Sequence, residues 1–144
     1  MIRGYFSTIG ATRRPFIFAF LQFPALNNRL FDVEFLVDTG ADRTLLSPSD
    51  ARSIGIDVNA LPFDVPSTGV SREPVSTRRI EAVLTVQYFS TPLTLYIPET
   101  PLAIPSVLGR NVISRFALFM EERTDTVLLL EPQEADSLRI HLPP

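Results

Sequence analysis

The ten residues FLVDTGADRT, at positions 35–44, determine how the rest of the sequence is interpreted. They overlap a segment, Leu30–Val37, that alternates apolar and polar side chains from Phe31 to Phe35 and then becomes apolar on both faces. Alternation is typical of a half-buried β-strand, and an apolar end is typical of a strand that runs into the protein interior. We therefore expect a strand that carries Asp38 to a buried position.

The length and composition of the chain predict one folded domain. The 144 residues fall within the usual size of a domain, roughly 100–200 residues. Because 45% of the residues are hydrophobic and 20% are charged, disorder is not expected outside the ends. We expect a single domain over residues 1–144, with its core between about residues 15 and 130. The net charge is −3 and comes from interspersed charges, so we expect no nucleic-acid partner.

Two residue types that often carry catalysis or bind metals are scarce. The chain has no Cys, and its only His is His141. A thiolate nucleophile and a cysteine metal site are therefore excluded, and a Ser-His-Asp triad or a histidine zinc site would have to be built from the tail. We expect no metal and no cofactor. Among hydrolytic mechanisms, catalysis by carboxylates remains.

The N-terminal segment superficially resembles a secretory signal, because the basic pair Arg13-Arg14 precedes the apolar run Pro15–Phe23. The run is shorter than the roughly 20 apolar residues of a membrane span, and it contains Gln22 without a small-x-small cleavage site behind it. We interpret it as a core strand. A cytoplasmic protein without membrane association is the expectation that follows.

Turn and helix signals divide the rest of the chain. The pattern predicts a hairpin of residues 16–23 and 31–37 around Asn27-Asn28, a helix within Ser47–Gly55, an exposed excursion over Leu61–Thr77, strands 79–86 and 93–97 joined near Ser90–Pro92, a helix within 107–116, and a hairpin of Ala117–Glu121 and Thr126–Leu130. The predicted fold class is mostly β with one or two short helices.

Asp38-Thr39-Gly40 alone is a weak signal, since the same tripeptide could form an Asx-turn at a strand end. Its flanks add specificity: residues 35–44 resemble the active-site motif of retroviral-type (retropepsin) aspartic proteases. About seventy residues later, Val107–Ile113 (VLGRNVI) resembles the Gly-Arg-Asp/Asn motif that opens the helix of that family, with Asn111 where many relatives carry Asp. The resemblance extends loosely over residues 15 to 130 and implies a closed, barrel-like acid protease fold.

The resemblance implies an aspartic endopeptidase with Asp38 as its catalytic carboxylate. Such enzymes hold a water between two carboxylates, one ionised to take a proton and one protonated to polarise the scissile carbonyl. This chain holds no second Asp-Thr/Ser-Gly. A homodimer would supply the second Asp38 across a two-fold axis. In the family the Thr of the motif hydrogen-bonds across that axis and the Gly lets backbone approach the water, roles that fall on Thr39 and Gly40.

Further site residues also follow from the resemblance. Ala41 continues the motif, and Asp42 would pair with Arg110 and contact the substrate backbone. A flap that closes over an extended peptide or protein substrate would come from the 61–77 excursion, with Thr68, Gly69 and Val70 near its tip. The multi-glycine tip common in viral members is missing here.

Two other functions stay open from the sequence. A retropepsin-fold module for dimerisation or peptide binding could have lost catalysis while keeping its scaffold. The chain could also be a plain β-barrel interaction domain in which both motifs are coincidental. The intact Asp38-Thr39-Gly40 favours activity, because a close pair of like-charged carboxylates costs stability and needs a function to retain it.

Overall fold

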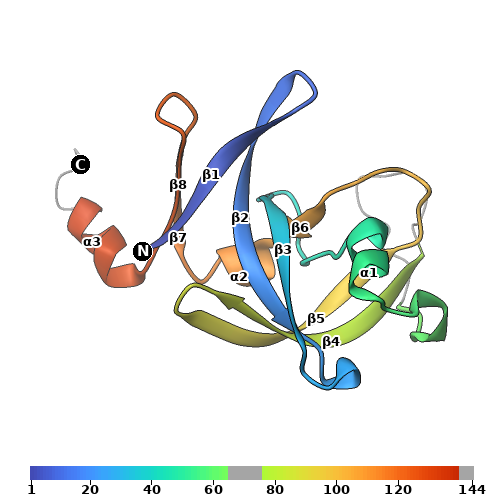
Figure 1. Ribbon diagram of the computed structural model, residues 1–144. Coiled ribbons are helices and arrows are strands. Elements are labelled where there is room, and N and C mark those ends of the chain that lie inside the picture. Colours follow the sequence, from blue (N-terminus) through green and yellow to red (C-terminus); the bar gives the residue numbers. More distant parts are fainter. Residues whose placement is uncertain (65–75, 140–144) are drawn as a thin grey trace.

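The computed structural model describes residues 1–64 and 76–139, and strands dominate it (Figure 1). The strands are β1 (Ile2–Ile9), β2 (Thr12–Gln22), β3 (Leu30–Val37), β4 (Thr77–Val86), β5 (Phe89–Pro98), β6 (Ser106–Leu108), β7 (Ala117–Glu121) and β8 (Thr126–Leu130). They form a sheet in the order β5-β4-β2-β1-β8-β7, and β3 pairs with both β2 and β6. The mostly β fold class is confirmed.

The sheet is open, which corrects the expectation of a closed barrel. β5 and β7 lie at its two ends, and no pairing joins them among the described residues. Strong twist still curves the long strands β2, β4 and β5 around the interior (Figure 1). "Barrel-like" therefore holds only loosely, because closure requires every strand to have two neighbours.

Three short α-helices accompany the sheet in the described part of the chain, where one or two were expected. They are α1 (Pro48–Ile54), α2 (Arg110–Ile113) and α3 (Pro132–Arg139), and two 3₁₀ turns occupy Pro24–Leu26 and Val58–Ala60. The helix expected within 107–116 is shorter than predicted because its first residues belong to β6. α3 was missed since its sequence is largely polar and only Ala135 on it is buried.

The helix α1 confirms its sequence signals residue by residue. The Ser47 side chain caps it by accepting a 3.0 Å hydrogen bond from the Asp50 amide, and Pro48 occupies the first turn. Gly55 ends the helix at a φ of 92°, in the left-handed region that a side chain disfavours.

Both predicted hairpins are present, one formed by β2 and β3 and the other by β7 and β8. Asn27 and Asn28 adopt positive φ between β2 and β3, as the turn required, and Asp125 does so between β7 and β8. The β4–β5 turn was placed wrongly: it falls at Gln87, while Pro92 lies inside β5 opposite Val83. A proline is tolerated there because β5 is an edge strand, where one side of the backbone needs no ladder hydrogen bond.

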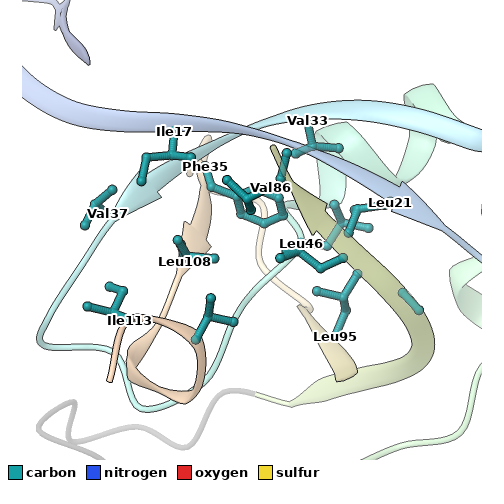
Figure 2. Packing of buried hydrophobic residues seen from close by; sticks show 14 of the residues in the cluster. Ile17, Leu21, Val33, Phe35, Val37, Leu46, Val86, Leu95, Leu108 and Ile113 are labelled. Atoms are coloured by element: carbon teal, nitrogen blue, oxygen red, sulfur yellow. The ribbon is translucent and has the colours of Figure 1, made fainter. Parts of the chain in front are cut away.

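The apolar run interpreted as a core strand is β2, and one face of it contributes side chains to the core. Its Ile17, Ala19 and Leu21 are buried in a cluster with side chains from β3, β4, β5 and β6. Figure 2 shows Phe35 of β3, Leu108 of β6 and Ile113 of α2 within this core. The two motifs singled out in the sequence are thus rooted in one core. Over the described residues, no helix is long and apolar enough to cross a membrane.

Candidate active site

Asp38 lies immediately beyond the end of β3, where that strand runs parallel to β6. In this pairing Val37 stands opposite Leu108, and the Asp38 amide donates a 3.1 Å hydrogen bond to the Leu108 carbonyl. Adjacent parallel strands end at the same edge, so Asp38 and the start of α2 are brought together. The parallel pair is what joins two motifs that lie about seventy residues apart.

Asp38 opens a tight turn. Its Oδ1 accepts a 2.8 Å hydrogen bond from the Gly40 amide, and its carbonyl accepts one of 3.2 Å from Ala41. This is the Asx-turn geometry that a strand end commonly uses. The Asp38 side chain is partly exposed, while Thr39 and Gly40 are exposed. The turn thus presents the carboxylate at the surface of a single chain, and the deep burial expected from the sequence is not seen there.

The helix α2 holds the turn from one side through backbone and side-chain contacts. The Arg110 amide donates a 2.8 Å hydrogen bond to the Ala41 carbonyl, and the Asn111 amide donates one of 3.3 Å to the Asp42 carbonyl. The Arg110 guanidinium also forms an ion pair with the Asp42 carboxylate. Both side chains are more than half exposed, so the ion pair itself is screened by water.

A buried hydroxyl completes the link between the loop and α2. Thr44 is fully buried and donates a 2.8 Å hydrogen bond to Oδ1 of Asn111, while its oxygen accepts a 3.2 Å bond from the Gly109 amide. Gly109 has no room for a side chain, because a Cβ there would lie 2.3 Å from the Arg43 carbonyl oxygen. Sequence reasoning assigned no role to Thr44 or Gly109, although both stand inside the quoted motifs.

The tip residues expected for the flap, Thr68, Gly69 and Val70, lie outside the described residues. The two ends of the excursion are described and pair with each other. Phe63 forms an antiparallel bridge with Arg78, and the Asp64 amide donates a 2.8 Å hydrogen bond to the Thr77 carbonyl. Residues 62–64 are therefore paired antiparallel with the start of β4, and we call this pairing the hairpin base.

Within residues 1–64 and 76–139, no cluster of three His, Asp or Glu side chains could hold a metal ion. What the site offers chemically is one partly exposed carboxylate on a turn fixed by backbone hydrogen bonds. One carboxylate can serve as a general base or acid, but it cannot fill both roles in the same step.

The aspartyl protease family model matches residues 25–112, which include the Asp38 turn, β6 and most of α2. The chain belongs to the aspartyl protease family. No curated protein sequence matches it. Among solved structures, the chain is similar to a retropepsin-like aspartic protease from Rickettsia conorii, with 22% identity and a TM-score of 0.59 over 81% of this chain and 82% of that one.

A second similar structure is the EIAV protease complexed with the inhibitor HBY-793. It shares 18% identity and a TM-score of 0.54, covering 75% of this chain and 92% of that one. At these identities the likeness shows the fold, which is that of retropepsin-like proteases. The resemblance stated from the two sequence motifs is confirmed at the level of family and fold.

Proposed function

We propose that the chain is a dimeric aspartic endopeptidase, in which two Asp38 side chains, one from each subunit, activate a water for peptide hydrolysis. The observation that supports this most is the Asp38 turn, held at the β3–β6 edge by the Leu108 carbonyl and by α2. A turn fixed by backbone contacts gives the reacting carboxylate a defined position, which is what catalysis by pre-organised groups requires.

In the proposed mechanism the two carboxylates share one proton. The ionised Asp38 takes a proton from the water as it attacks the scissile carbonyl carbon, and the protonated Asp38 of the second copy donates a hydrogen bond to the carbonyl oxygen. Two close carboxylates do not both ionise readily, so the pair holds these complementary states over a range of acidic pH. The amine leaves with a proton returned from the dyad.

The need for a second copy rests on the sequence and on exposure. The chain carries one Asp-Thr-Gly, and a two-fold axis beside it places the same tripeptide on both sides. Thr39 and Gly40 are exposed and Asp38 is partly exposed in one chain, so these residues are accessible to a partner copy. We propose that Thr39 hydrogen-bonds across the axis and that Gly40 leaves room for the water.

The remaining assignments are also proposals. Ala41, Asp42 and Arg110 would brace the turn and bind substrate backbone, and Thr68, Gly69 and Val70 would contribute to a flap. The substrate would be an extended peptide or protein segment, bound by its backbone as an added strand. All of these groups belong to one proposed domain, residues 1–144.

The experiment compares wild type with Asp38→Asn on a peptide library at about pH 4–6. Asp32→Asn is the matched control, because Asp32 is an exposed carboxylate on β3, the strand that leads to Asp38. Cleavage by wild type and Asp32→Asn but not by Asp38→Asn is expected. Equal cleavage by Asp38→Asn would rule out the proposed chemistry, and peptide binding without any cleavage by wild type would point to the inactive module.

The two-copy site has a separate test. Asp38→Asn subunits, added in excess to wild type, should form mixed dimers with one carboxylate and lower the activity in proportion to their share. Asp32→Asn subunits in the same excess should leave the activity unchanged. Full activity of a chain that sedimentation shows to be monomeric at the assay concentration would contradict the dimer.

A further inference from the structure

Arg43 lies between Asp42 and Thr44 on the loop of residues 38–44, which we call the active-site loop. Its side chain has two partners, and neither is Asp38. Its guanidinium donates a 2.5 Å hydrogen bond to Oδ2 of Asp64, and it lies over the Tyr96 ring at 4.4 Å from the centroid. The Asp64 side chain is only 13% exposed. An ion pair with one largely buried partner is screened less than a fully exposed one.

The stacking partner is fixed by the backbone. The loop runs beside β5, because Leu45 forms a parallel bridge with Tyr96 and the Leu46 amide donates a 2.9 Å hydrogen bond to the Tyr96 carbonyl. The backbone of Tyr96, whose ring stacks with Arg43, is therefore held beside this loop. A guanidinium stacked on an aromatic ring is restricted in its rotamers, and this directs it toward Asp64.

Asp64 belongs to the hairpin base formed by residues 62–64 with the start of β4. Besides the Asp64 bond to Thr77, the Arg79 amide donates a 3.1 Å hydrogen bond to the Pro62 carbonyl. Among the described residues, the Arg43–Asp64 pair is the side-chain hydrogen bond that joins the active-site loop to this hairpin base. On its other side the loop is held by α2, through the contacts of Thr44, Ala41 and Asp42.

We propose that Arg43 is a positioning residue that sets the distance between the Asp38 loop and the hairpin base at residues 62–64, and that peptide binding depends on this spacing. The inference rests on the proposed peptidase function and names a residue for it. Arg43 contacts Asp64 and Tyr96 rather than the Asp38 carboxylate, so its loss weakens substrate binding and affects the chemical step less.

The kinetic test uses Arg43→Gln, Asp64→Asn and the double variant. Each single change should raise KM roughly three- to tenfold with a smaller change in kcat. The double variant should be no worse than either single variant, because all three lack the same contact. Arg43→Lys, which retains the charge but loses the planar stack, should recover part of the loss.

Arg13→Gln is the matched control. Arg13 also combines an ion pair, 2.7 Å to Asp125, with a position over an aromatic ring, that of Phe6, but it lies at the start of β2, where β2 pairs with β1. The inference would be overturned if Arg43→Gln and Arg13→Gln had the same KM. It would also be overturned if the KM increases of Arg43→Gln and Asp64→Asn added up in the double variant. Thermal unfolding of every variant identifies a KM change that merely reflects a partly unfolded protein.

A second readout does not require catalysis. Hydrogen exchange of the Asp64 and Arg79 amides reports directly on the hairpin base, since both donate its cross-strand bonds. Both amides should exchange faster in Arg43→Gln and at the wild-type rate in Arg13→Gln. If wild type cleaves nothing, the proposed function fails while this measurement still decides the inference: unchanged exchange in Arg43→Gln would overturn it.

Discussion

The Thr44 hydroxyl and the Asn111 side-chain oxygen lie 2.8 Å apart, with the fully buried Thr44 donating to the more exposed Asn111. The same hydroxyl oxygen accepts the Gly109 amide hydrogen at 3.2 Å. One side chain thus satisfies two polar groups, one just before α2 and one on it, and links them to the loop that starts at Asp38. Since Asn carries no charge, this link does not change with pH.

Thr44→Val should remove both hydrogen bonds while keeping the shape of the side chain. The buried Gly109 amide then loses its acceptor, at an expected cost of about 1–3 kcal/mol in the free energy of unfolding, while the oxygen of the exposed Asn111 can turn to water. Denaturant unfolding measures the loss. Thr124→Val is the control, because its hydroxyl bond to Thr126 is exposed. Equal stability of the two variants would show that the Thr44 link contributes little.

Gly109→Ala should displace the active-site loop, because the added Cβ would meet the Arg43 carbonyl at 2.3 Å, and backbone cannot move aside cheaply. We expect a loss of about 1–3 kcal/mol in stability together with a loss of peptide cleavage. In Gly10→Ala the Cβ meets open space and only the positive φ of 65° is strained. That control should lose about 1 kcal/mol and keep its activity. Retained cleavage in Gly109→Ala would contradict the close approach.

Arg110→Gln separates a role in the site from a role in stability. The Arg110–Asp42 ion pair is exposed, so its removal should change the free energy of unfolding by less than about 1 kcal/mol. If Arg110 holds the Asp38 turn in position for substrate binding, kcat/KM should fall although the free energy of unfolding changes little. Arg123→Gln, which breaks an exposed pair with Glu121 in the β7–β8 hairpin, is the comparison. Equal kcat/KM values in the two variants would remove Arg110 from the site.

Leu108→Ala tests whether the core supports the site. Leu108 is fully buried opposite Val37 of β3, and its truncation should cost about 2–5 kcal/mol of stability through lost burial and an unfilled cavity. Leu102→Ala, at a position 70% exposed, should change stability by less than about 0.5 kcal/mol. Thermal and denaturant unfolding of both variants measure the contrast. A small loss of stability in Leu108→Ala would mean that the surrounding side chains move into the cavity and fill it.

Local signals predicted the parts of the fold that local chemistry determines. Ser47, Pro48 and Gly55 specify the start and end of α1 by themselves, and Asn27-Asn28 specifies the turn between β2 and β3. Each of these choices depends on neighbours in sequence, so no knowledge of the rest of the molecule was needed.

Tertiary context decided the rest. β1 was not predicted, because only Ile2 on it is buried and its stability comes from pairing with β2 and β8. Pro92 indicated a turn, yet its place on an edge strand lets it remain in β5. The Arg43–Asp64 contact joins two exposed-looking charges whose sequence neighbours give no sign of a partner.

The parallel pairing of β3 with β6 also sets when the site can form. Asp38 leaves the ribosome about seventy residues before Leu108, and until then neither the carbonyl that accepts its amide nor the Arg110 and Asn111 amides that hold the turn exist. Contacts so distant in sequence form late in folding. A nascent chain therefore carries its Asp-Thr-Gly unsupported while about seventy further residues are added, so any activity that depends on this turn begins only after β6 and α2 have been synthesised.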